Sequence, residues 1–432
     1  MYGGLLKSAS ALAILAAAGL YGISPAKAAD LGGDCCADLE ERVAELEATT
    51  ARKGNRKVSL TISGHISQEL LFWDDGIRDD MYVTGTSASN SRWRFTGSAK
   101  ISPEITAGFL YEFQFYGSAN SSVNQTNGGD DLGNQGLGSA SGLLREAMAW
   151  MEHSRLGRVS IGHGNMASTN AMLVDLSGKS MGASNYIALH AGGMFINNGA
   201  TYSDLNWANF ISGTGDWLVG RHEHIQYRTP SIAGFTLGAS VGEDNIWDVA
   251  LRYAGEFNGV RIAGALGYSV QSEFDAPAGS SVDDFLCVTN CNKKIKQLAG
   301  SLSIRHMPTG LFFTGAAGTR DVENTLVGAA EVSFDADFWY ASGGIAKNFF
   351  GIGDTVLYGE YGVYSGVAQD SRLGLSASGV DMDHWGVGIV QHIDAAAMEL
   401  WLTYKNLSLS GALDANQQED YHMIAAGTRI RF

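Results

Sequence analysis

Short segments in which apolar and polar residues alternate recur from residue 58 to the end of the chain. In RWRFTGSAKI, residues 92–101, an extended backbone puts Trp93 and Phe95 on one face and Arg92 and Arg94 on the other. Segments of about ten residues with this alternation, separated by turns, are typical of transmembrane β-barrels, in which lipid contacts one face and water the other. Similar segments are EITAGFLYEFQFY (104–116), IWDVALRYAGEF (246–257) and MELWLTYK (398–405).

The breaks between these segments indicate their topology. About sixteen strand segments follow residue 58, and short links alternate with long polar ones, apart from one short link on the long side, 243–245. An even number of strands lets the last strand pair with the first, which removes the sheet edges that a bilayer does not tolerate. The predicted fold is an all-β transmembrane antiparallel barrel over residues 57–432, with a short N-terminal coiled-coil helix. The short links include 102–103, 155–157, 258–259, 308–310 and 351–353, and the long ones are 74–91, 117–142, 164–220, 272–295, 322–335, 367–383 and 410–420.

Composition excludes two other classes of protein. After residue 29, no stretch approaches the roughly 20 apolar residues that a membrane-spanning helix needs. The net charge of −16 argues against a nucleic-acid partner, because phosphate binding needs a basic surface.

The first residues have the features of a secretory signal peptide. Lys7 precedes an apolar run over residues 9–22, and Ala26 and Ala28 form a small-residue cleavage pattern. We expect residues 1–28 to be removed, so that the mature chain begins at Ala29. The alternative is an uncleaved anchor, but the run is short for a membrane span.

Residues 29–56 carry a short coiled-coil pattern. Its apolar positions are spaced by three, four and three residues, which indicates a seam of about two heptads. A helix this short is unstable alone in water, so we expect it to form where several copies meet. The alternative is a single solvated amphipathic helix or a linker. The seam residues are Cys36, Leu39, Val43 and Leu46.

Three features together resemble the general-diffusion porins of alphaproteobacterial outer membranes. They are CCADLEERVAELEATTARKGNRKVSLTISGHI (35–66), WDDG (73–76) and the C-terminal residue Phe432. The resemblance implies a homotrimer of sixteen-stranded barrels in outer-membrane lipid and passive diffusion of small hydrophilic solutes. It also implies that Phe432 is the recognition signal for the barrel-assembly machinery.

The longest link, residues 164–220, follows the fifth strand segment. A link much longer than about 15 residues without its own structure is usually functional or disordered. The resemblance implies that it folds inward and narrows the lumen, and its mixed apolar and acidic residues suit a loop that packs on a wall and shows carboxylates to water. The alternative is a loop that folds outward or covers a neighbour. The candidate carboxylates are Asp175, Asp204 and Asp216.

Several basic residues occupy strand positions that are expected to face the lumen, on the second strand and the last two strands. Arg94 and Lys405 are expected at mid-depth, Arg92 near the outer mouth, and Lys100 and Arg431 near the inner one. The alternative is that each is an ordinary solvated lumen charge. Acidic and basic groups that face each other across a narrow, wet throat create a transverse field that disfavours apolar solutes. The predicted basic wall consists of Arg92, Arg94, Lys100, Lys405, Arg429 and Arg431.

The sequence indicates no catalytic site, metal site or cofactor. His222 and His224 share a strand face without further ligands nearby in the sequence, and Ser63 and His65 lack an evident third member of a hydrolase site. Cys287 and Cys291 suit a disulfide in an outer loop, with a free or metal-binding pair as the alternative. Within the channel class, a substrate-selective channel remains open, and a structural or adhesive barrel is the third candidate.

Overall fold

The computed structural model describes residues 57–115, 118–128, 144–179, 187–197, 202–208, 218–243, 245–272, 291–326, 332–366, 381–410 and 419–432. The predicted signal peptide, residues 1–28, and the predicted coiled-coil segment, residues 29–56, lie outside the described residues, as do Cys287 and Asp216. For Asp204 and Cys291, only the backbone is described.

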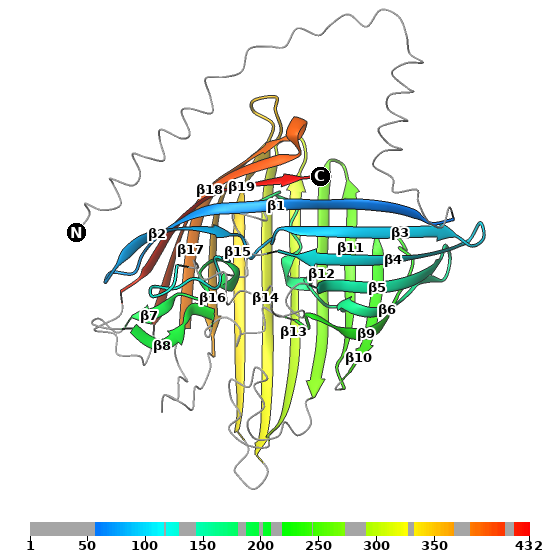
Figure 1. Ribbon diagram of the computed structural model, residues 1–432, viewed down its shortest axis with the longest axis horizontal. Coiled ribbons are helices and arrows are strands. Elements are labelled where there is room, and N and C mark those ends of the chain that lie inside the picture. Colours follow the sequence, from blue (N-terminus) through cyan, green and yellow to red (C-terminus); the bar gives the residue numbers. More distant parts are fainter. Residues whose placement is uncertain are drawn as a thin grey trace, which may run out of the picture. The chain divides into compact units, whose positions relative to one another are not determined.

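One antiparallel sheet of seventeen strands forms the wall of a barrel. β3 pairs with the first half of β1 and β2 with the second half, so β2 and β3 together occupy one strand position. β1 also pairs with β19, from His65↔Arg431 to Asp74↔His422, and this pairing closes the sheet (Figure 1). The result is a closed barrel with sixteen strand positions, which confirms the predicted fold class.

The strands of the wall follow one another around the barrel in chain order. They are β1 (Ser59–Asp74), β2 (Asp79–Gly85), β3 (Arg92–Lys100), β4 (Ile105–Gln114), β5 (Leu144–His153), β6 (Gly157–Asn165), β9 (Arg221–Arg228), β10 (Phe235–Gly242), β11 (Trp247–Phe257), β12 (Val260–Ser272), β13 (Cys291–His306), β14 (Leu311–Leu326), β15 (Val332–Lys347), β16 (Thr355–Ser365), β17 (Asp381–Ile393), β18 (Met398–Ser410) and β19 (Tyr421–Arg431).

Burial alternates along the strands as the sequence does. On β11, Trp247, Val249 and Leu251 are exposed, whereas Asp248 and Ala250 are almost fully buried. The apolar side chains therefore cover the outside of the barrel, and the polar ones point inward. An apolar outer face on a sheet without free edges is the arrangement that a lipid bilayer requires.

The connections differ in length at the two ends of the barrel. At one end, Asn258 and Gly259 alone join β11 to β12, and both have positive φ angles, 49° and 74°. This is the backbone of the hairpin turns that match strand twist, and Asn-Gly is the pair best suited to it. We refer to this end as the short-turn end.

The first long link differs from the prediction. Residues 74–91 were expected to form a single loop, but β2 lies within them and extends the wall. The Asp75 carboxylate explains the tight turn before β2, because its Oδ1 accepts hydrogen bonds from the N–H groups of Ile77 and Arg78 at 3.0 and 2.8 Å.

Residues 166–220, which we call the inner loop, connect β6 to β9. The described parts contain η2 (Ala171–Leu173), α3 (Ala188–Ala191), β7 (Phe195–Asn197) and β8 (Tyr202–Asn206), and β7 pairs with β8. No helix in the described ranges is long and apolar enough to cross a membrane. The largest buried hydrophobic cluster combines inner-loop residues with inward-facing wall residues, so the core of the protein lies between this loop and the wall.

Candidate functional site

The first residues of the inner loop are fixed to β10 and β11. The Ser168 N–H and Oγ both donate to Asp248 Oδ2, each over 2.6 Å. The Ala167 N–H donates to Ser240 Oγ at 2.8 Å. Hydrogen bonds to a buried carboxylate are among the stronger ones in proteins, so the loop is held to the wall where it begins.

Two serines of β13 bind the next part of the loop. The N–H groups of Val174 and Leu176 donate to Ser301 Oγ and Ser303 Oγ at 3.0 and 2.9 Å. Ser301 Oγ also donates to the carbonyl oxygen of Ala171 at 2.6 Å. Ser301 and Ser303 are two residues apart and so share the inward face of the strand. The residues from η2 to Leu176 therefore run along the inner wall.

Asp175 lies in a polar cluster between the loop and the wall. Its carboxylate accepts hydrogen bonds from Ser177 Oγ at 2.6 Å and Thr314 Oγ1 at 3.0 Å, and it lies 3.6 Å from Lys179 Nζ. Burial by itself raises the pKa of this carboxyl, but Lys179 and these hydrogen bonds outweigh that effect and hold the pKa below its usual value. The expectation that Asp175 shows its carboxylate to water does not hold: its side chain is 12% exposed, because it anchors the loop.

The far part of the loop meets the end of β1. Gln125, from the link between β4 and β5, donates through Nε2 to Asp75 Oδ2 and to the carbonyl oxygen of Phe195, each at 2.9 Å. Asn197 Nδ2 donates to the carbonyl oxygen of Asp75. Apolar contacts from the same cluster include Leu71, Trp73, Ile187, Met194 and Trp207. These anchors place the loop along the wall from β10 to β1.

The wall across the lumen from β13 carries a cluster of arginines. β13 is the eighth strand on from β3 among sixteen positions, so the two lie half way round the barrel from each other. Around Glu112 of β4, Arg92 donates at 3.0 Å, and Arg94 and Arg145 donate through Nε at 2.8 Å. We call these three residues the arginine cluster. Glu112 is buried, whereas the Arg94 side chain is 44% exposed and so presents positive charge to the lumen.

Lys405 has a different environment from the one expected. It is fully buried, and its Nζ donates to Glu360, which is equally buried. Tyr340 links this pair to the loop: its hydroxyl accepts from Lys179 Nζ at 3.3 Å and donates to Glu360 Oε2 at 2.8 Å. The loop covers this part of the wall, so Lys405 is an internal ion pair and not a charge at the throat.

The remaining predicted basic residues lie apart from the arginine cluster. Arg429 and Arg431 on β19 both bind Glu399 of β18, at 2.7 and 2.8 Å, and Arg429 NH1 also donates to Ser89 Oγ at 3.0 Å. Lys100, the last residue of β3, is exposed.

The alternation of inward and outward residues did not predict that Arg145 faces the lumen, because the strand pairing is irregular at this position. The pairing of β4 with β5 shifts register between Glu112↔Glu146 and Phe113↔Leu144, so Arg145 lies in a bulge. A bulge changes which side chains face the lumen, and nothing in the alternation of the sequence marks it.

The pairs considered for other chemistry have ordinary partners. His65 Nε2 hydrogen-bonds Ser89 Oγ at 3.0 Å, and His224 Nδ1 hydrogen-bonds the carbonyl oxygen of His222 at 2.8 Å. Within the described residues, no group of three His, Cys, Asp or Glu side chains is placed to hold a metal ion.

A closed barrel with an apolar outer face, a polar inner face and a loop folded into its lumen defines a channel-forming membrane β-barrel. The family of Gram-negative porins matches residues 10–421, and the chain belongs to this family. It is therefore an outer-membrane protein that forms a water-filled channel for passive diffusion of small hydrophilic solutes and ions.

Solved porin-like structures share the fold at low sequence identity. The anion-selective porin from Comamonas acidovorans is 16% identical, with a TM-score of 0.56 over 87% of this chain and 100% of that one. Pseudomonas putida OprB is 9% identical, with a TM-score of 0.55 over 91% and 97%. Salmonella typhi OmpF, solved with daunomycin, is 14% identical, with a TM-score of 0.53 over 88% and 99%. The sequence matches none of the curated proteins.

Proposed function

We propose that this protein is a general-diffusion porin that selects solutes by size and charge at a throat between the inner loop and the arginine cluster. The observation that carries the proposal is the asymmetry of the lumen. The inner loop is anchored to β10, β11, β13 and β14. Arg92 and Arg94 stand on β3, half way round the wall from β13, and Arg145 lies two strands from them on β5.

The throat acts on solutes through fixed charge and orientation of water. Guanidinium groups that line a narrow aqueous passage favour anions and dipolar solutes, and they raise the cost for apolar ones, which cannot replace the ordered water. Such selection needs no energy source and no chemical step, so we propose a passive channel and not an enzyme.

The sequence supports further proposals about export and assembly. Residues 1–28 are a cleaved signal peptide, and residues 29–56 form a periplasmic coiled-coil segment through which three copies associate. The short-turn end then faces the periplasm. The sequence features that resemble alphaproteobacterial general-diffusion porins support the further proposal that the chain belongs to that branch of the family.

The C-terminus supports a role in barrel assembly. The Phe432 N–H donates to the carbonyl oxygen of Gly64 at 3.0 Å, and its side chain is 59% exposed on the outside. An exposed terminal aromatic residue at the closing seam suits recognition by the barrel-assembly machinery, and the apolar outer face suits outer-membrane lipid.

Planar-bilayer recording tests the proposed function. Purified mature protein should insert and conduct in discrete steps without an energy source, and neutral solutes should pass at rates that fall with their size. Folded, inserted protein that conducts no ions would overturn the proposal. A flux that saturates for one sugar or amino acid only would favour a substrate-selective channel instead, and a plugged barrel would indicate a structural role.

A further inference from the structure

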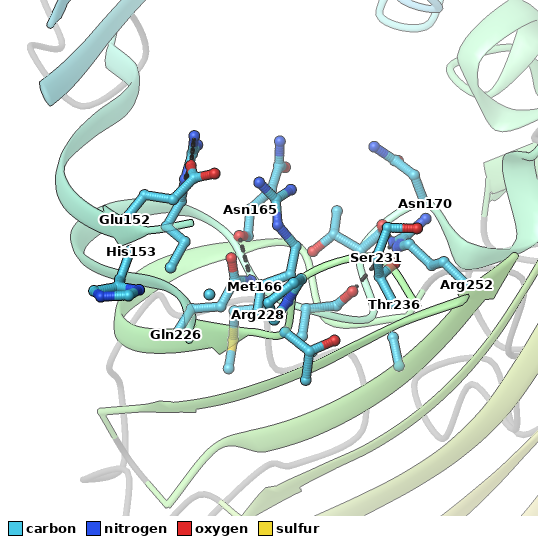
Figure 2. Close-up of a pocket in the computed structure, with 18 of the residues that line it drawn as sticks. Glu152, His153, Asn165, Met166, Asn170, Gln226, Arg228, Ser231, Thr236 and Arg252 are labelled. Carbon is cyan, nitrogen blue, oxygen red and sulfur yellow. Dashed lines mark hydrogen bonds and ion pairs between the residues drawn. The ribbon is translucent and has the colours of Figure 1, made fainter. Parts of the chain in front are cut away.

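A cavity of about 590 Å³ opens into the lumen where the inner loop leaves β6 (Figure 2). It is lined by β5, β6, β9, β10 and β11 together with the first residues of the loop. Ser154 and Ser231, from two short connections, also line it, so it extends from the first residues of the inner loop to the short-turn end of the barrel. It is separate from the arginine cluster, none of whose members lines it.

The charged residues that line this cavity are mainly arginines. Arg158, Arg228 and Arg252 contribute three positive charges and Glu152 one negative charge, so these four residues leave two positive charges in excess. Figure 2 shows Arg228 between Glu152 at one end of the cavity and Arg252 at the other. A cavity with excess positive charge attracts anions. The attraction is stronger than it would be in open water, because the surrounding protein excludes part of the solvent.

Two of the three arginines form no ion pair with a carboxylate in the part of the chain that the structure describes. Arg158 Nε donates to Glu152 Oε2 at 2.6 Å, and its guanidinium lies 4.1 Å from the centre of the Trp150 ring. Arg252 donates only to the carbonyl oxygens of Ala167 and Thr169, at 3.1 and 2.7 Å, among its described contacts. The backbone of Arg228 pairs within the sheet, but its guanidinium has no hydrogen-bond or ion-pair partner among the described residues.

The size of the cavity and its neutral donors narrow the class of anion. Its volume falls within the roughly 300–1,000 Å³ of small-molecule sites and exceeds what a single inorganic ion fills. Asn170, Ser231 and Thr236 add amide and hydroxyl groups to the lining. The guanidinium fork of Arg228 matches one carboxylate in two parallel hydrogen bonds. The Nη2 of Arg252 is engaged by the carbonyl oxygens of Ala167 and Thr169, so Arg252 offers a second carboxylate its positive charge and its remaining N–H groups. The two arginines therefore suit a ligand with two carboxylates.

We propose that this cavity is a binding subsite for small dicarboxylates, which would give the channel a saturable step on the short-turn side of the throat. The inference rests on the proposed diffusion function, because the ligand reaches the subsite through the lumen. Arg252 also holds the carbonyl oxygens of Ala167 and Thr169, so a bound dicarboxylate lies beside the first anchors of the inner loop and obstructs the passage there.

The test uses succinate on the full-length mature protein. Single-channel current in KCl is recorded at constant ionic strength while succinate replaces part of the chloride, and binding to detergent-solubilised protein is measured separately by calorimetry. We expect saturable binding and a matching, saturable reduction of current. Arg228→Gln should weaken both on the order of tenfold, because it removes a charged hydrogen-bond donor. The control is Arg261→Gln: Arg261 is paired with Glu256 at 2.7 Å and does not line the cavity, so succinate affinity should be unchanged.

The conductance and binding measurements distinguish a failure of the dicarboxylate subsite from a failure of the proposed diffusion function. Absence of any conductance in KCl alone contradicts the diffusion function. Normal conductance with no saturable succinate binding overturns the subsite. Equal loss of affinity in Arg228→Gln and Arg261→Gln also overturns it, because the effect is then the general charge of the lumen. Monomethyl succinate or inorganic phosphate binding as tightly as succinate would exclude dicarboxylates as the ligand class.

Discussion

At the scale of single residues, two basic side chains of the same inward parity have opposite environments. The Arg94 side chain is 44% exposed to the lumen, whereas that of Lys405 is completely buried against Glu360. A passing ion interacts strongly with a fixed charge only within the Debye length, about 8 Å at physiological salt, and when no counter-charge covers it. Arg94 is paired with Glu112, but Arg92 and Arg145 share that single carboxylate, so the exposed cluster keeps a net positive charge. The charge of Lys405 is buried and is covered by Glu360 alone.

We therefore predict that Arg94→Gln shifts ion preference toward cations. The reversal potential across a KCl gradient measures the shift, which should be largest at low salt, where screening is weakest. Lys100→Gln is the matched control, because it removes one exposed positive charge from the same strand, near the short-turn end. If both variants shift the reversal potential equally, the selectivity is not localised at the arginine cluster.

At the scale of elements, the inner loop is held by polar groups and not by its own secondary structure. Its helices are short: η2 has three residues and α3 has four. A helix of one turn has little stability of its own, so the position of the loop depends on wall residues such as Asp248, Ser301 and Thr314.

Asp175→Asn should loosen the loop without opening the barrel. The change removes the carboxylate next to Lys179, and we expect it to weaken local anchoring by about 2 kcal/mol, the value of a hydrogen bond to a charged group. Hydrogen exchange in residues 166–179 should rise and open-channel current noise should increase. Asp394→Asn, in an exposed short turn, is the control and should change neither.

The same carboxylate predicts a pH dependence. Because the pKa of Asp175 is lower in the anchored loop than its usual value of 3.8, its stabilising effect is complete above that value and is lost as the pH falls through the lower one. Acid should therefore raise current noise in the wild type below about pH 4 and have less effect in Asp175→Asn. Equal acid responses in both proteins would show that another group controls the loop.

At the scale of the whole molecule, the barrel closes within one chain, and its closure does not depend on association with other copies. The ten paired positions between β1 and β19 close each barrel within one chain. Association is proposed from the predicted seam of Cys36, Leu39, Val43 and Leu46, which lies outside the described residues.

Leu39→Asp together with Leu46→Asp should reduce trimer formation while the barrel still folds, because charges on a coiled-coil seam are costly to bury. Mass measurement in detergent gives the oligomeric state, and heat-resistant β-structure in circular dichroism reports the barrel. A wild-type monomer would remove the proposed role of the seam. An unchanged trimer in the double variant would mean that the barrel walls associate without it.

The alternation of residues determined the wall of this barrel. In a strand, facing depends only on odd or even position, a local property that is readable from segments such as residues 92–101 and 246–257, and the Asn258–Gly259 turn is equally local. That is why the number of strand positions and the closing of the last strand on the first followed from the sequence, while β2 and the bulge at Arg145 interrupted the period and were missed.

The tertiary structure alone decided which inward-facing charges meet water. Asp175 was expected at the throat from its place in the long loop, and Lys405 from its inward-facing strand position. The inner loop instead packs Asp175 and Lys179 against Thr314 and Tyr340 of the wall and covers the Lys405–Glu360 pair, which removes both residues from the lumen. The arginine cluster and the cavity at Arg228 and Arg252 lie on neighbouring strands, but their access to water also depends on the position of the inner loop. Their exposure depends on which stretch of wall the loop covers, and long-range contacts of that kind leave no periodic mark in the chain.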